Sequence, residues 1–261
     1  MRSDRPIRHG AHRRQADPGA VSLARALSKL GASTRTGAEE LIRSGRVRVN
    51  GTLLRDAQVR VDLGHDSITL DGKRLKPRQF RYVAFHKPAG IVTTHADERG
   101  RTTVFDVLGP VAGDLRTVGR LDKETTGLLL LTNDHRMADR LTDPAVGIPK
   151  QYRAVLSRAL TEAEVGQLAG GVEIMISGVR YRTRPAVVKT TGTALDLTIT
   201  EGKNRQVRKM IEALGISVLA LTRRAVGSVD LGTLPSGRWR DLSEAEVRAL
   251  KLSVGLQGAW V

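Results

Sequence analysis

The 261-residue chain contains no cysteine, which excludes disulfide bonds, thiolate metal sites and cysteine nucleophiles. A chain without cysteine fits a reducing compartment such as the cytosol. No apolar run approaches the roughly 20 residues that span a bilayer, and the first twenty residues lack the apolar stretch of a secretory signal. We therefore expect a cytoplasmic protein that has no membrane partner.

Aromatic side chains are scarce, with two Trp, three Tyr and three Phe, so few residues could stack on a nucleobase. The sequence also lacks clustered histidines and a phosphate-binding glycine loop. We therefore expect neither a metal nor a nucleotide or redox cofactor.

Positive charge is the largest excess: Lys and Arg number 43 against 27 Asp and Glu, which gives a net charge of +16 and a pI near 11.0. Such a balance favours a polyanionic partner. An arginine-biased genome would give the same totals. A basic membrane-surface protein would carry a basic amphipathic anchor helix, and none is evident.

Changes in amino-acid composition along the chain predict four segments. Residues 1–20 have the basic, Pro- and Gly-containing character of a disordered tail, which is either an RNA-grasping arm or a solvated end without function. A small module over 21–76, a linker over 77–80 and a larger domain over 81–255 follow.

The small module combines two short helices with short strands. SLARALSKLG has the apolar stripe of an amphipathic helix that ends at Gly31, and in TRTGAEELIRSG the spacing of Thr36 and Glu39 predicts a capping box. RVRVNG predicts a strand that leads into a type I′ hairpin at Asn50-Gly51. QVRVD and SITLDG are expected to be further strands.

This module resembles the alpha-L RNA-binding domain, first described in a small-subunit ribosomal protein. The matching residues are Leu23, Gly31, Arg35, Ala38, Glu39, Leu41, Ile42, Gly45, Val47, Val49, Asn50 and Gly51. The cations that could form one basic face for phosphates are Arg25, Lys29, Arg35, Arg43, Arg46 and Arg48. A merely solvated polar face is the alternative.

The larger domain alternates between strand and helix patterns. RYVAFHKPAGIVTT predicts a strand, a turn and a second strand, and TGLLLLTND predicts a strand buried on both faces. Asn133 or Asp134 is expected to cap a helix that stops before Pro144. KQYRAVLSR and ALDLTIT predict strands, whereas TEAEVGQLAGG and NRQVRKMIEALG predict helices.

Asp122 lies in GRLDKETTG, the loop that feeds the leucine strand, so its carboxylate is expected at the edge of a core. Burying a lone charge costs several kcal/mol, so a guanidinium partner is expected. Such a carboxylate could act as a nucleophile or a base, or it could simply cap a turn or form a salt bridge.

The partner is expected from the helix predicted over NRQVRKMIEALG, which follows the glycine loop EGK. Arg205, Arg208 and Lys209 fall opposite its apolar face, so one cation could hold Asp122 while others contact phosphates. A solvated helix face would show the same pattern. Tyr152, in an alternating strand, could stack on a base and handle a proton, or be an ordinary core tyrosine.

KPAGIVTT, VGRLDKETTGLLLLTND, KQYRAVL and EGKNRQVRKM occur in this order after the alpha-L module. Together they resemble the bacterial ribosomal RNA pseudouridine synthase family, the branch that modifies single uridines of 16S or 23S RNA. The resemblance implies an α+β fold, in which a mixed, mainly antiparallel sheet flanked by helices follows the alpha-L domain. It also implies an isomerase without a cofactor, acting on large-subunit (23S) ribosomal RNA, free or within an assembling subunit. We expect a monomer.

The resemblance assigns roles residue by residue. Asp122 matches the essential aspartate, Tyr152 the tyrosine that stacks on the target base, and Arg208 the cation that pairs with the aspartate. Arg120 matches the residue associated with the space that the flipped nucleotide vacates. RNA contacts are expected from Arg120, Arg35, Arg43, Arg46, Arg48, Lys203, Arg205 and Lys209.

Two other functions fit parts of the pattern. A non-catalytic ribosome-assembly factor could use the same scaffold to bind RNA, although the Asp122, Tyr152 and Arg208 set argues against it. An aspartate-based nucleoside hydrolase would need a water-activating site, and no second paired carboxylate is evident.

Overall fold

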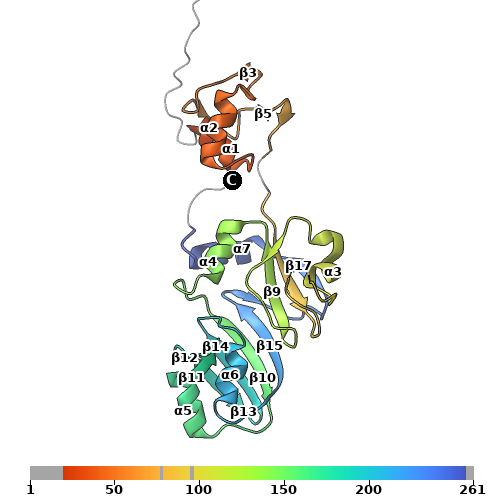
Figure 1. The fold of residues 1–261 in the computed structure, drawn as a ribbon, viewed down its shortest axis with the longest axis vertical. Coiled ribbons are helices and arrows are strands. Elements are labelled where there is room, and N and C mark those ends of the chain that lie inside the picture. The colour runs from red at the N-terminus through yellow and green to blue at the C-terminus, as the bar shows by residue number, and fades with distance from the viewer. Residues whose placement is uncertain (1–19, 77–78, 95–96, 257–261) are drawn as a thin grey trace, which may run out of the picture. The chain divides into compact units, whose positions relative to one another are not determined.

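The computed structural model describes residues 20–76, 79–94 and 97–256 of the chain. It divides into two compact units, Met1–Gln79 and Phe80–Val261 (Figure 1). The predicted tail at residues 1–20 lies outside the described residues apart from Ala20, and so do residues 77–78 of the predicted linker. Within the described ranges, no helix is long and apolar enough to cross a bilayer.

The first unit packs two helices against short strands, because each helix carries its apolar side chains on one stripe. Helix α1 (Leu23–Lys29) and helix α2 (Arg35–Arg43) share one core with the strands. The strands are β1 (Val21–Ser22), β2 (Val47–Val49), β3 (Thr52–Leu53), β4 (Arg60–Val61), β5 (Ile68–Leu70) and β6 (Lys73–Arg74). Four of them form a sheet in the order β3-β2-β5-β6, and β1 pairs with β4.

Two local predictions for this unit have different outcomes. The hairpin at Asn50-Gly51 is confirmed: both residues have positive φ, 51° and 82°, as a type I′ turn requires, and Val49 pairs with Thr52. The capping box at Thr36 is wrong. Thr34 caps α2 by accepting from the Gly37 N–H at 3.2 Å, and Thr36 lies within the first turn, where it cannot cap.

The second unit is built on a mixed, mainly antiparallel sheet, which confirms the expected fold class. The strands of this sheet are β7 (Tyr82–Lys87), β8 (Arg116–Thr117), β9 (Thr126–Thr132), β10 (Lys150–Leu156), β13 (Val187–Thr191), β14 (Ala194–Ile199), β15 (Val218–Val226), β16 (Val229–Asp230) and β17 (Trp239–Asp241). Their order is β13-β14-β10-β15-β9-β7-β17, with β16 beside β15 and β8 beside β9. The β15–β9 pair is parallel and joins Thr222 to Thr126 and Arg223 to Gly127.

Helices and one hairpin flank this sheet. The helices are α3 (Val104–Leu108), the 3₁₀ turn η1 (Gly109–Val111), α4 (His135–Thr142), α5 (Glu162–Gly170), α6 (Gln206–Glu212) and α7 (Glu244–Ser253). Strands β11 (Glu173–Ile176) and β12 (Val179–Arg182) form a separate hairpin. Helices α5 and α6 share a core with β10 and β14, whereas α4 and α7 pack on β9.

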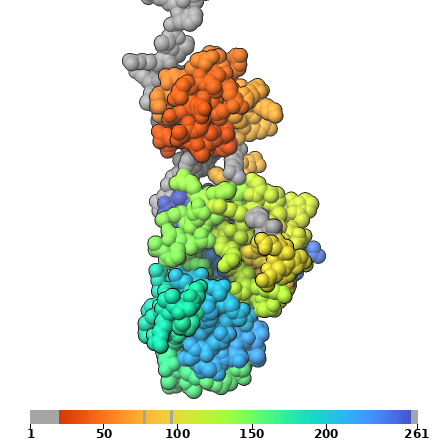
Figure 2. Space-filling model, viewed as in Figure 1, coloured from red at the N-terminus to blue at the C-terminus, as the bar shows by residue number. Residues whose placement is uncertain are grey.

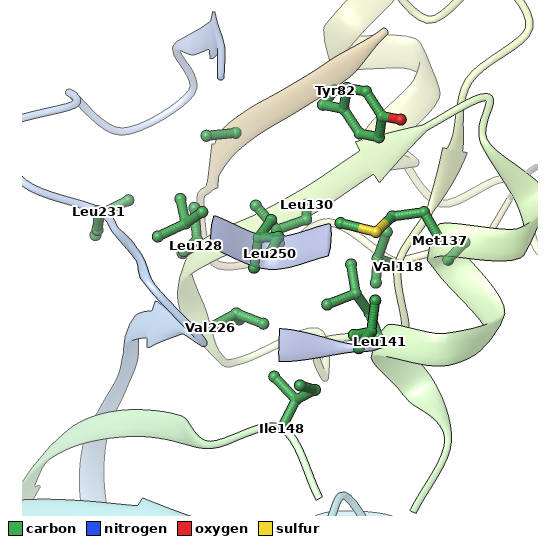
Figure 3. Packing of buried hydrophobic residues seen from close by; sticks show 14 residues of the cluster. Tyr82, Val118, Leu128, Leu130, Met137, Leu141, Ile148, Val226, Leu231 and Leu250 are labelled. Atoms are coloured by element: carbon green, nitrogen blue, oxygen red, sulfur yellow. The ribbon is translucent and has the colours of Figure 1, made fainter. Parts of the chain in front are cut away.

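Strand β9 is buried on both faces, as its four leucines predict. Leu128 and Leu130 belong to the cluster that includes α4 and α7 (Figure 3). Leu129 and Leu131 point to the opposite side and pack with α3, because side chains alternate along a strand. Asp134 then caps α4 by accepting from the Met137 N–H at 3.1 Å. The strand therefore fixes the position of the loop before it, which carries Asp122.

The second strand predicted in RYVAFHKPAGIVTT does not form. Residues 91–94 make only an isolated bridge between Val92 and Thr103. The Thr93 hydroxyl instead contacts the backbone of Leu121, donating to its carbonyl at 2.9 Å and accepting from its N–H at 3.3 Å. The segment thus braces the Asp122 loop.

Candidate active site

A buried lysine, Lys87, holds the loop that carries Asp122. Lys87, at the end of β7, has no solvent exposure. Its ammonium donates to the carbonyls of Pro88 at 3.0 Å, Lys123 at 3.2 Å and Thr125 at 3.0 Å. Burial lowers the pKa of Lys87 to about 8, although the negative charges of Asp122 and Glu124 oppose that shift. A cation with three backbone partners thus braces the loop that carries Asp122.

Replacing Lys87 by Met is expected to lower the free energy of unfolding by on the order of 3 kcal/mol, since three buried carbonyls lose their donor. The pKa of Lys87 is lower in the folded chain than its ordinary 10.5, so the unfolded chain binds more protons in this window. The stability of the wild type should therefore rise relative to Lys87→Met as the pH increases from about 8 to 10.5.

Urea unfolding at several pH values measures this difference. Lys209→Met is the matched control, because its ammonium donates to one carbonyl, that of Met175 at 2.8 Å. The control should cost less, and equal costs for the two variants would contradict the bracing role of Lys87.

A cavity of about 350 Å³ opens in the second unit, where the Asp122 loop meets β10, β15 and the segment before α6. Figure 2 shows the green surface on one side of this unit and the cyan and blue surface on the other side meeting across a hollow. The lining side chains with reactive or charged groups include Asp122, Lys150, Tyr152, Glu201 and Arg223. The volume falls in the range of small-ligand sites, roughly 300–1,000 Å³.

Tyr152 and Asp122, which are 30 positions apart in the chain, line this one cavity. Tyr152 is half-buried and packs against two apolar clusters. In the sheet it lies opposite Leu197 of β14 and Arg223 of β15. A ring in this position can present one face to a planar ligand in the cavity.

Arg208 does not form the predicted ion pair with Asp122. Its guanidinium donates to the carbonyls of Val218 at 3.1 Å and Glu124 at 3.4 Å, and its Nε is buried without a hydrogen-bond partner among the described residues. Arg208 is buried in α6, whereas the sequence pattern placed it on the solvent side. It therefore contacts the backbone of the Asp122 loop and not the carboxylate.

The predicted common face of Arg205, Arg208 and Lys209 is also wrong. Helix α6 starts only at Gln206, and Arg205 precedes it in the left-handed conformation with φ 51°, which few residues other than glycine adopt. Lys209 turns to the Met175 carbonyl. Arg205 and Lys203 line the cavity together with the exposed Arg120.

Arg223 is the cation that the sequence reasoning missed. It is only 3% exposed, it lines the cavity, and its Nε donates to the Leu128 carbonyl at 2.8 Å. Its Nη2 is buried and has no hydrogen-bond partner in the part of the chain that the structure describes. The sequence did offer one indication of this burial: Arg223 lies midway between Leu221 and Ala225, and in a strand with alternating side chains these three positions face the same, inward side.

Lys150 is a second cation of the cavity that the sequence reasoning did not assign. Its ammonium donates to the Ile148 carbonyl at 3.0 Å. Burial lowers the pKa of Lys150, and the charge of Arg223 lowers it further. Lys150 and Arg223 both line the cavity, and their like charges favour an anion there.

Glu201 is a buried carboxylate that organises the loop at the cavity wall. It accepts from the Tyr181 hydroxyl at 2.5 Å, from the Arg184 N–H at 3.0 Å and from the Gln206 amide. The Gln206 carbonyl oxygen in turn accepts from the Lys203 N–H at 2.9 Å. With these donors, Glu201 is a structural group, which leaves Asp122 as the cavity carboxylate whose side chain makes no hydrogen bond to a described residue.

The four arginines predicted to bind RNA in the first unit are all exposed. Arg46 is paired with Asp71, with nitrogen–oxygen distances of 2.9 and 2.5 Å. Arg48 donates to the Gly51 carbonyl at 3.0 Å. The side chains of Arg35 and Arg43 make no hydrogen bond or ion pair with any described residue, so they are the most available for phosphates.

Comparison with known proteins identifies both units. Residues 22–68 match the S4 domain, and residues 81–213 match the family described as RNA pseudouridylate synthase. The chain belongs to the RNA pseudouridine synthase family. The expected recognition, the order of the two domains and the enzyme class, an isomerase acting on RNA, are thereby confirmed.

Relatives of this synthase cover nearly its whole length. It is 37% identical to an uncharacterized RNA pseudouridine synthase of Mycobacterium leprae, over 91% of this chain and 95% of that protein. It is 34% identical to ribosomal large subunit pseudouridine synthase B of Bacillus subtilis, over 88% and 95%. A crystal structure of a pseudouridylate synthase matches with a TM-score of 0.62 and 31% identity, over 88% of this chain and 99% of that one.

Proposed function

We propose that this synthase converts a specific uridine of large-subunit (23S) ribosomal RNA into pseudouridine, with Asp122 as the nucleophile. The observation that carries the proposal is the single cavity that Asp122 and Tyr152 share. The ribosomal substrate is supported by the name of the Bacillus subtilis relative and by the net charge of +16. The protein is proposed to act as a monomer.

The reaction detaches uracil from the ribose, turns it and rejoins it through carbon 5, so nothing is added or removed. Asp122 either attacks carbon 1′ of the ribose or takes the proton from carbon 2′, which would form a glycal. Tyr152 is proposed to stack on the base and to take part in the transfer of the proton that leaves carbon 5. No step needs a metal, nucleotide or redox cofactor.

The target nucleotide must leave its stack to reach the cavity, which costs a few kcal/mol. Arg120, Lys203 and Arg205 lie at the cavity and are exposed or half-exposed, so they can offset this cost through phosphate contacts. Arg120, two residues before Asp122, is proposed to occupy the space that the nucleotide vacates. Arg208 is proposed to act on the Asp122 loop through the Glu124 carbonyl.

Pseudouridine mapping tests the proposal. Ribosomal RNA from cells that lack the protein should miss one pseudouridine of the large-subunit RNA, and the purified protein should restore it on that RNA or on the isolated subunit. An unchanged large-subunit map, or a missing site in small-subunit RNA, would contradict the proposed substrate.

The first unit is proposed to bind RNA through Arg35 and Arg43, whose guanidinium groups are available. Replacing both by Gln should weaken binding of the RNA and reduce the slope of log affinity against log salt by about 0.7–0.9 for each phosphate that the variant no longer neutralises. Filter binding at several salt concentrations measures the slope. Arg46→Gln is the control, because the charge of Arg46 is already balanced by Asp71. An equal change of slope in the control would contradict the assignment.

A further inference from the structure

The cavity contains a cation that the proposed roles of Asp122 and Tyr152 do not use. The Arg223 guanidinium is fixed by its Nε bond to the Leu128 carbonyl, and its buried Nη2 has no partner among the described residues. Leaving a charged donor unpaired in a buried site is costly. A substrate that supplies an acceptor there would remove this cost.

The sheet register places this cation beside the proposed base-stacking residue. Arg223 of β15 and Tyr152 of β10 are direct cross-strand partners, and such partners have Cβ atoms about 4.5–5.5 Å apart. A base that stacks on the Tyr152 ring therefore lies next to the Arg223 guanidinium. Lys150, two positions before Tyr152 on the same strand, adds a second positive charge on that face.

The proposed reaction produces an anion at this place. When the bond between carbon 1′ and nitrogen 1 breaks, its electron pair stays on the uracil, whose charge spreads over nitrogen 1 and the two carbonyl oxygens. Carbon 5 then bonds to carbon 1′ as the bond from carbon 1′ to Asp122 breaks or, in the glycal route, as carbon 2′ regains its proton, and this step removes the charge from the uracil. A base afterwards takes the proton from carbon 5, and nitrogen 1 is protonated. A fixed, buried donor stabilises such a transient charge strongly.

We propose that Arg223 is a catalytic residue of this synthase, whose guanidinium donates a hydrogen bond to a uracil carbonyl oxygen and stabilises the departing uracil anion. The inference rests on the proposed function of the same cavity. It differs from the expected role of Arg208 because Arg223 acts on the base and not on the aspartate. The required substrate feature is a carbonyl oxygen that gains negative charge as the glycosidic bond breaks.

The test uses the full-length protein and a synthetic RNA fragment spanning the mapped target, radiolabelled at that nucleotide. The target nucleotide is either uridine or 5-fluorouridine. Because 5-fluorouracil is the stronger acid, its anion leaves more easily and needs less help from a cation. The single-turnover rate at which the parent nucleoside disappears from the digested RNA is measured for each substrate.

Arg223→Gln should lower the rate on uridine about a hundredfold or more, with RNA binding unchanged, and its loss on 5-fluorouridine should be clearly smaller. Arg223→Lys keeps the charge and should lose less on uridine. Arg224→Gln is the matched control, because Arg224 is the adjacent, exposed arginine at the β-bulge and does not line the cavity. It should react at the wild-type rate.

A folded Arg223→Gln protein with the wild-type rate, or with equal losses on the two substrates, would overturn the inference. If the Gln variant does not fold, the same comparison on Arg223→Lys decides in the same way. Failure of the wild type to modify any ribosomal RNA would instead contradict the proposed function, so the two failures are distinguishable.

Discussion

Asp122→Asn should abolish turnover: the release of tritium from RNA labelled at carbon 5 of uracil is expected to fall by at least about 10⁴-fold, the scale seen when a nucleophile is removed. The amide has nearly the same shape as the carboxylate, but it can neither attack carbon 1′ nor accept a proton from carbon 2′. RNA binding should stay close to wild type, because the Asp122 side chain makes no hydrogen bond that holds the surrounding loop within the described residues.

Glu124→Gln is the matched control for this experiment. Glu124 lies two positions further along the same loop, its side chain is exposed, and it does not line the cavity. The same exchange of an acid for an amide there should leave tritium release almost unchanged. Retained turnover in Asp122→Asn would rule out both proposed roles of the carboxylate.

Gly127→Ala should unfold or severely destabilise the second unit, by more than about 3 kcal/mol. Gly127 has a φ of +106°, and a Cβ built there would lie 2.3 Å from the Arg223 carbonyl oxygen and 2.6 Å from the Arg223 nitrogen. Both contacts are with backbone, which cannot move aside without breaking the parallel pairing of β9 and β15. Thermal and urea unfolding measure the loss.

Gly166→Ala, in the same unit, is expected to have the opposite effect on stability. Gly166 lies within α5, its φ is not positive, and a Cβ there meets nothing within 4 Å. Alanine should therefore stabilise the helix by roughly 0.5–1 kcal/mol. If Gly127→Ala were as stable as the wild type, the close approach of the two strands would be refuted.

Features set by neighbouring residues were predictable from the sequence. The leucine strand, the Asp134 cap and the Asn50-Gly51 hairpin each depend on a few adjacent side chains, and each is found as expected. The capping residue of α2 was misplaced by two positions because Thr34 and Thr36 both suit a cap, and only the start of the helix distinguishes them.

Features set by distant pairing were not predictable. The burial of Lys87 depends on carbonyls of Lys123 and Thr125 that a single loop conformation brings to its ammonium. The position of Arg223 in the cavity depends on its pairing with Tyr152 and Gly127. No pattern of neighbouring residues in the sequence reveals that pairing. Arg208 was predicted on the solvent side because the spacing of the apolar residues suggested a helix with one buried and one exposed face. The buried side of α6 is wider than that spacing suggested, and it includes Arg208.

The pairing of Gly127 with Arg223 also has a consequence for biosynthesis. The loop of Asp122 and the strand of Arg223 are about a hundred positions apart, so the cavity closes only after β15 has been made and has left the ribosome. The first unit contains all its own sheet partners and can fold long before that, since domains generally fold as units during synthesis. A nascent chain would thus be able to hold RNA before it is able to modify it.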